Sequence, residues 1–116
     1  MSEFTIYHNP RCSKSRTALA LLREHGVEPE IILYLETAPS ESEIAGLLDK
    51  LGIPATQLVR RGEAEYKASG LSAQSSEREV LKAMAQHPKL IERPVVVHGD
   101  HAVLGRPPEN VLELLD

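Results

Sequence analysis

The chain has 116 residues, a length that corresponds to one domain with an ordinary hydrophobic core. A formal net charge of -4, with three tyrosines, one phenylalanine and no tryptophan, argues against general nucleic-acid binding. No apolar run approaches the roughly 20 residues that span a bilayer, and no secretory signal is visible. One cysteine cannot form an internal disulfide, which fits a reducing, cytoplasmic setting. Together these features predict a cytoplasmic protein that contacts neither membranes nor nucleic acids.

The first third of the sequence predicts a strand, a helix and a second strand. Residues 4–7 alternate as a strand does, and a helix is expected over 13–25, with Gly26 as its C-cap. Residues 31–35 are apolar throughout. That pattern predicts a central strand that is buried on both faces.

Two capping boxes predict helices in the middle of the chain. Ser40 with Glu43 and Ser76 with Glu79 have the required spacing, and apolar residues at helical intervals follow each pair. Between these helices we expect a short helix near residues 56–60 and then a turn-rich connection that holds Glu63 and Glu65 in a solvated loop.

The last quarter predicts a hairpin and a closing helix. Two β-prone runs, 95–98 and 101–104, flank a two-residue Gly-Asp link. A helix is expected after the prolines at 107–108. The element order predicts an α/β fold with a thioredoxin-like βαβ…ββα core. We expect a single domain over 1–116 with a central helical insertion at about 38–90.

Cys12 stands between the first strand and the first helix. Residues 8–16 contain three cations, at Arg11, Lys14 and Arg16, and no acidic residue. Helix N-terminal amides and nearby cations both favour a thiolate. We therefore expect the pKa of Cys12 to be depressed and this thiol to react, the alternative being a buried, inert cysteine.

The same helix N-terminus is expected to cradle an oxyanion substrate. The amides in question belong to Ser13, Lys14, Ser15 and Arg16. His8 lies at the end of the first strand, where it is placed to orient or stabilise the thiolate. Dithiol oxidoreductases have a second cysteine at the position of Ser15. Its absence implies that an external thiol, such as glutathione or a glutaredoxin, completes any redox cycle.

Several segments together carry a family resemblance that runs nearly end to end. They are residues 6–16, 32–36, 58–60, 86–88, 91–97 and 105–108. The chain resembles the glutaredoxin-coupled arsenate reductase (ArsC) family, whose fold is thioredoxin-like with a helical insertion. The resemblance implies catalysis by Cys12 and oxyanion binding by Arg60, Arg93 and Arg106. It also implies arsenate as substrate, glutathione as co-substrate, glutaredoxin as partner and no tightly bound cofactor.

In the family, the thiolate attacks arsenate and forms a cysteine–arsenic adduct. Guanidinium groups suit this chemistry because they neutralise an oxyanion and donate several hydrogen bonds. Thioredoxin-like folds also place a cis-proline beside the active thiol, so we expect a cis Arg93–Pro94 bond.

Other readings are a glutathione-dependent thiol oxidoreductase with another substrate and an RNA-polymerase-binding redox regulator. The regulators typically carry Cys-x-x-Cys, which Ser15 removes here. His98 and His101 are expected to face each other across the hairpin as an exposed pair, without a metal.

Overall fold

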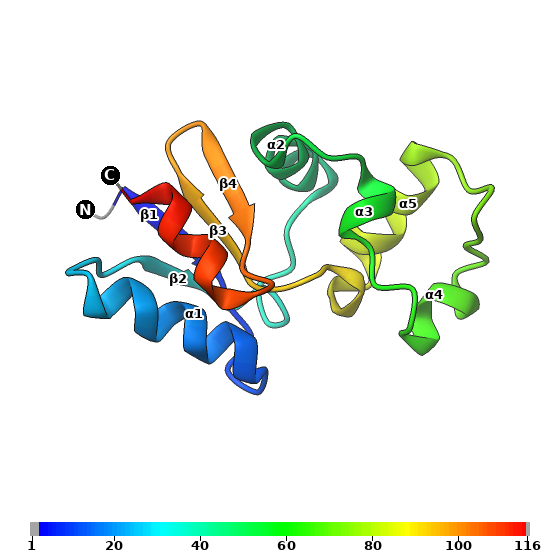
Figure 1. Cartoon of the computed structure of the whole chain (residues 1–116). Coiled ribbons are helices and arrows are strands. Elements are labelled where there is room, and N and C mark those ends of the chain that lie inside the picture. Colours follow the sequence, from blue (N-terminus) through cyan, green and yellow to red (C-terminus); the bar gives the residue numbers. More distant parts are fainter. Residues whose placement is uncertain (1–2, 116) are drawn as a thin grey trace. The chain divides into compact units, whose positions relative to one another are not determined.

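The computed structural model describes residues 3–115, which form two compact units. The first unit joins the two ends of the chain, up to Thr37 and again from Arg93 onward. The second unit is the continuous segment Ala38–Glu92. Figure 1 shows the elements of both units, which are described separately below.

The first unit is built on a four-stranded sheet. Its strands are β1 (Phe4–Tyr7), β2 (Glu30–Ile32), β3 (Val95–His98) and β4 (His101–Leu104). The spatial order is β2-β1-β3-β4 (Figure 1). β1 pairs with β2 in parallel and with β3 antiparallel, and β3 with β4 forms the expected hairpin. This arrangement confirms the predicted thioredoxin-like α/β core.

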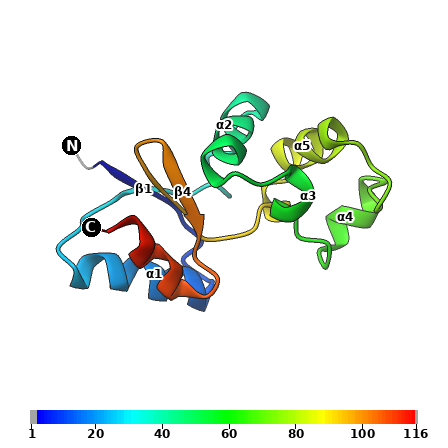
Figure 2. The same ribbon diagram turned by 45° about the horizontal axis from the view of Figure 1, so that its top comes forward.

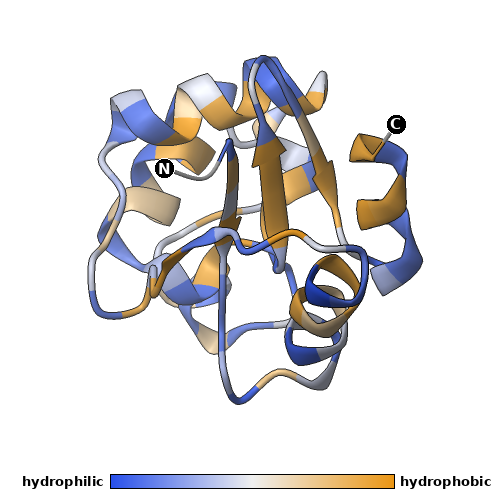
Figure 3. Ribbon diagram, turned by 90° about the vertical axis from the view of Figure 1, so that its left-hand side faces the viewer, coloured by the Kyte–Doolittle hydropathy of each residue, from blue (hydrophilic) through white to orange (hydrophobic). Residues whose placement is uncertain are grey.

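Two helices pack together on one face of this sheet. They are α1 (Ser13–Glu24) and the 3₁₀ helix η2 (Pro108–Leu114), which lie side by side in Figures 1 and 2. Ile6 and Val96 are paired neighbours on β1 and β3, and both belong to the apolar cluster formed with these helices. Figure 3 shows the hydrophobic colouring of the hairpin strands. The core therefore fixes α1, and with it the Cys12 loop, to the sheet.

Helix α1 is ended by Gly26, which follows it in the chain. Gly26 has φ 81°, its N–H donates to the carbonyl of Arg23, and the N–H of Val27 donates to the carbonyl of Leu22. These two bonds make a Schellman motif, in which glycine tolerates the left-handed conformation. The helix thus stops at Glu24, one residue before the predicted end.

The prediction of a central buried strand at 31–35 was wrong. β2 ends at Ile32 and lies at an edge of the sheet, and Ile31 and Leu35 are 38% and 42% exposed. The central apolar strand is β3, whose valines at 95–97 are all buried. An unbroken apolar run does not by itself distinguish an edge strand from a central one, because strand order depends on distant segments.

The second unit is helical. Its elements are α2 (Glu41–Leu51), α3 (Ala55–Leu58), α4 (Ala64–Ala68), α5 (Glu77–Gln86) and the 3₁₀ turn η1 (Pro88–Leu90). The hydroxyl of Ser40 accepts the N–H of Glu43, and Ser76 with Glu79 makes a complete capping box. Both predicted helix starts are confirmed.

The short helix α4 was not predicted. Glu63 lies at its N-terminus and pairs with Arg60, and Glu65 pairs with Lys89 at 3.9 Å. These carboxylates are therefore partly buried members of ion pairs and not part of a solvated loop. α4 has five residues and no buried side chain, so it leaves no apolar periodicity in the sequence. Within residues 3–115 no helix has the length and apolar character needed to cross a membrane.

Candidate active site

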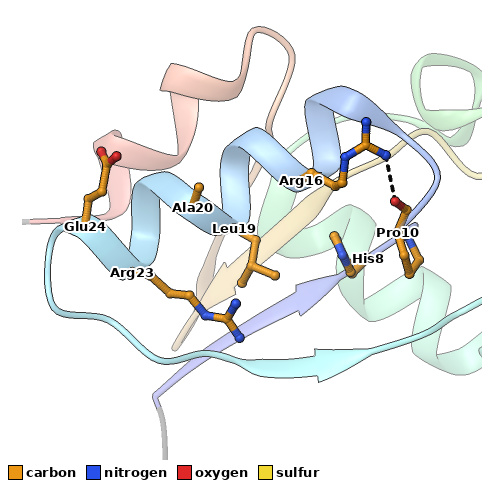
Figure 4. A pocket seen from close by; sticks show the side chains of 7 residues that line it. All are labelled: His8, Pro10, Arg16, Leu19, Ala20, Arg23 and Glu24. Atoms are coloured by element: carbon orange, nitrogen blue, oxygen red, sulfur yellow. Dashed lines mark hydrogen bonds between the residues drawn. The ribbon is translucent and has the colours of Figure 1, made fainter.

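The loop that precedes α1 is closed by its own backbone. The N–H of Cys12 donates to the carbonyl of Asn9 at 3.0 Å, and the side chain of Arg16 donates to the carbonyl of Pro10 at 2.8 Å (Figure 4). Asn9 in turn accepts the N–H of Arg11 through Oδ1 at 3.0 Å. Cys12 is the N-cap residue of α1 and is partly exposed. The thiol is thus held at the positive end of a twelve-residue helix.

The pKa of Cys12 is lowered from its ordinary value of 9.0. Burial is the largest contribution and acts in the opposite direction, because it penalises the charged thiolate. Hydrogen bonds from the Ser15 amide, the Arg93 side chain and the Lys14 amide, together with the charge of Arg93, outweigh it. The direction agrees with the sequence-based prediction.

The source of the positive charge differs from the prediction. Arg11, Lys14 and Arg16 are exposed, and the cation that lowers the pKa of Cys12 is Arg93, from the segment before β3. The side chains of Lys14 and Arg16 point outward to solvent, whereas backbone amides of the first turn point at the N-cap. Of the four predicted amides, those of Lys14 and Ser15 face the thiol, while that of Arg16 donates to the Cys12 carbonyl at 3.0 Å. Ser13 is exposed at the start of the helix.

The β3–β4 hairpin brings two of the predicted arginines together. Val95 lies opposite Leu104, so Arg93 and Arg106 flank the open end of the hairpin. Nη1 of Arg106 donates to the carbonyl of Arg93 at 3.2 Å. Arg93 thus interacts with Cys12 through its side chain and with Arg106 through its carbonyl, although it lies 81 positions after Cys12 in the chain.

Three residues lie beside these two arginines in the chain: Pro94, Gly105 and Pro107. Pro94 follows a cis peptide bond, as predicted, and Pro107 follows a second cis bond that was not predicted. Gly105 donates its N–H to the carbonyl of Pro94 at 2.9 Å. A Cβ on Gly105 would lie 2.7 Å from Cγ of Pro94, so only glycine fits here. Sequence reasoning missed this role of Gly105, since a lone glycine after a strand gives no sign of its neighbour.

Arg60 lies in the second unit. It follows a β-bridge between Val59 and Ile91, and its N–H donates to the carbonyl of Leu90 at 2.7 Å. Its guanidinium lies 3.6 Å from carboxylate oxygens of both Glu63 and Glu92. Oxyanion binding by Arg60 stays a prediction from the family resemblance.

His8 and Ser15 form a buried pair behind the loop. Nδ1 of His8 lies 2.6 Å from Oγ of Ser15, and Oγ also accepts the N–H of Asn9 at 3.1 Å. Ser15 is fully buried and His8 is 6% exposed. Burial lowers the pKa of His8, and the charges of Arg23 and Arg16 lower it further, so the imidazole is neutral near pH 7. His8 therefore supports the loop through Ser15, and a direct action on the thiolate stays a prediction.

The hairpin histidines occupy the expected positions. His98 and His101 are directly opposite, and His98 stacks on Phe4 with ring centroids 4.0 Å apart. His98 also lies 3.4 Å from Glu3. Within residues 3–115 no group of three or more His, Cys, Asp or Glu side chains is arranged to hold a metal ion.

Comparisons with known proteins place the chain among its relatives. A family model described as the ArsC family matches residues 7–114. An uncharacterized protein of Escherichia coli, YfgD, is 52% identical over 112 residues, which cover 95% of this chain and 94% of that protein. A Haemophilus influenzae protein named arsenate reductase is 48% identical over 112 residues, which cover 95% of this chain and 97% of that protein.

A solved structure described as an arsenate reductase from Vibrio cholerae is 50% identical to this chain. It superposes with a TM-score of 0.93, over 97% of each chain. The family match spans the Cys12 loop as well as the segments of Arg93 and Arg106. The chain therefore belongs to the ArsC family.

Proposed function

We propose that this protein is an arsenate reductase that depends on glutathione and a glutaredoxin. The observation that carries the proposal is a single cysteine whose pKa is lowered at a helix N-terminus beside Arg93, whose carbonyl accepts a hydrogen bond from Arg106. Relatives named arsenate reductase, at 43–48% identity over most of the chain, support the choice of oxyanion.

In the proposed first step, arsenate binds where the charge of Arg93 and Arg106 and the amides of Lys14 and Ser15 converge. Attack of a thiolate on an anion is otherwise repulsive, so neutralisation of the substrate by guanidinium groups is what permits it. Sulfur of Cys12 attacks arsenic, a sulfur–arsenic bond forms, and one arsenate oxygen leaves as water after taking up two protons.

The remaining reduction requires thiols from outside the chain, because Ser15 stands where a second cysteine would be needed. Over one turnover, arsenate accepts two electrons and two protons and leaves as arsenite and water. The thiols of glutathione and glutaredoxin supply these electrons and end as a disulfide, while Cys12 returns to the thiol. We propose that the protein works in the cytoplasm, where the cellular poise keeps a lone thiol reduced.

A coupled assay with arsenate, glutathione, glutaredoxin and an NADPH-driven recycling system tests the proposal. We expect the wild-type protein to produce arsenite and Cys12→Ser to produce none. Asp49→Asn, an exposed substitution on α2, is the control and should retain the wild-type rate. Wild-type protein that forms no arsenite under these conditions would reject arsenate as substrate. Reduction of a glutathione mixed disulfide by the same sample would then favour the general thiol oxidoreductase.

A further inference from the structure

A pocket lies along α1 in the first unit, and the proposed chemistry does not account for it. Its volume is about 620 Å³, within the range of pockets that hold small ligands. Figure 4 shows that its charged side chains come from one helix, at Arg16, Arg23 and Glu24, while Leu19 contributes apolar surface. Pro10, which belongs to the Cys12 loop, also lines the pocket. We propose that this pocket binds glutathione, an inference that rests on the proposed function.

The charges of the pocket complement those of the tripeptide. Glutathione carries two carboxylates and one ammonium, and the pocket offers two guanidinium groups and one carboxylate. Guanidinium groups bind carboxylates through paired hydrogen bonds, which favours this ligand over a thiol without carboxylates. Glu24 supplies the anion that an ammonium requires.

Each guanidinium group already has one partner in the first unit but retains further N–H donors for such a ligand. Arg16 donates one N–H to the carbonyl of Pro10, and no other partner of its guanidinium occurs in the described range 3–115. Arg23 donates three hydrogen bonds to the carboxylate of Glu28, through Nε at 3.2 Å and through Nη2 at 2.9 Å. The two side chains are 50% and 70% exposed, so water screens this ion pair and a ligand carboxylate can compete for the Arg23 guanidinium. The pKa of His8, which burial lowers first, is lowered further by Arg23 and Arg16, in keeping with both charges lying near it.

The pocket adjoins the loop that carries the reactive thiol. Pro10 lies two residues before Cys12, and the N–H of Arg16 donates to the Cys12 carbonyl at 3.0 Å. An extended tripeptide spans about 10 Å, enough to join an anchor on α1 to this loop. The pocket would thus hold the external thiol that a chain without a resolving cysteine requires.

Binding of S-methylglutathione, which cannot react, tests the proposal by isothermal titration calorimetry. We expect Arg23→Glu to weaken binding by about tenfold or more, because a charge-assisted hydrogen bond is replaced by repulsion. The Michaelis constant for glutathione in the coupled assay should rise by a similar factor. Arg78→Glu makes the same charge change at an exposed site on α5 and should bind as the wild type does.

Glu28→Gln distinguishes the role of Arg23 in the pocket from its role in the ion pair. It removes the partner of Arg23 while Arg23 stays in the pocket, so binding should be equal to the wild type or tighter. Equal binding by wild type and Arg23→Glu, or no wild-type binding at millimolar ligand, would overturn the proposal. If wild type forms no arsenite but Arg23→Glu still loses binding, the arsenate assignment fails and the glutathione pocket stands.

Discussion

Cys12 ionises against the effect of its own burial. Burial alone would hold the proton on sulfur, yet two backbone amides and one guanidinium reverse the balance. The amides belong to α1 and are fixed as soon as the helix forms. Arg93 comes from a distant segment and is present only when the sheet has assembled. Activation of the thiol is therefore a property of the folded first unit and not of the loop alone.

At the residue scale, Ser15 is a support for the loop. Its hydroxyl bonds both His8 and the backbone of Asn9 in a buried position. Ser15→Ala leaves these two groups unsatisfied, so we expect the free energy of unfolding to fall by about 1–3 kcal/mol. Urea denaturation measures this change. Ser13→Ala, on the exposed side of the same helical turn, should change stability by less than about 0.5 kcal/mol; equal losses in the two variants would refute the role of Ser15.

His8 should make stability depend on pH. The pKa of His8 in the folded protein lies below 6.5, its ordinary value. As pH falls, His8 is therefore protonated in the unfolded chain before it is protonated in the folded protein. Stability from this group is fully present above pH 6.5 and is lost as pH falls through that value toward the folded pKa. We expect His8→Gln to flatten the fall in unfolding free energy between about pH 7 and 5, measured by denaturation at each pH. His25→Gln, an exposed control, should retain the slope, and an unchanged slope in His8→Gln would contradict the account.

At the scale of elements, the site depends on one hairpin end. The carbonyl of Pro94 accepts the N–H of Gly105, which holds together the backbone segments that carry Arg93 and Arg106. Because Nη1 of Arg106 also donates to the carbonyl of Arg93, a shift of either backbone segment disturbs the position of Arg93 relative to Cys12. The close approach of Gly105 to Pro94 is thus the contact most sensitive to side-chain volume.

Gly105→Ala should damage the site in a way that a glycine elsewhere does not. The new methyl group would lie 2.7 Å from Pro94, so the backbone must move. Overpacking of this kind costs about 1–3 kcal/mol, and we expect slower alkylation of Cys12 as Arg93 shifts. Gly46→Ala in α2 has open space and should gain up to about 1 kcal/mol. Thermal unfolding and alkylation kinetics measure both variants; Gly105→Ala with wild-type behaviour in both assays would exclude this contact as a determinant.

At the scale of the whole molecule, local sequence patterns predicted most helices and strands, whereas contacts between distant segments could not be predicted. The helix caps at Ser40 and Ser76 and the Gly-Asp turn act within a few residues, so the sequence reveals them directly. The edge position of β2 depends on which strand pairs on the far side of β1, which no local pattern encodes. The short helix α4 forms without a buried face and so gave no signal.

The candidate site likewise has parts that the sequence predicts and parts that only the structure shows. Cys12 and its helix N-terminus could be predicted because loop and helix are adjacent in sequence. Arg93 and Arg106 came from family resemblance, since an isolated arginine before a proline is usually a surface residue. The bond between His8 and Ser15, and the contact of Gly105 with Pro94, required the structure because each joins side chains or segments with no shared motif.

The central claim is that Arg93 and the end of α1 make Cys12 a thiolate at lower pH than an ordinary cysteine. The rate of alkylation by iodoacetamide against pH measures this directly, because the chain has one cysteine. We predict a wild-type midpoint below that of a free cysteine, which lies at about 8.5. We also predict a higher midpoint in Arg93→Gln and no change in Arg11→Gln, whose side chain is exposed. A wild-type midpoint at or above about 8.5, or one that Arg93→Gln leaves unmoved, would contradict the claim.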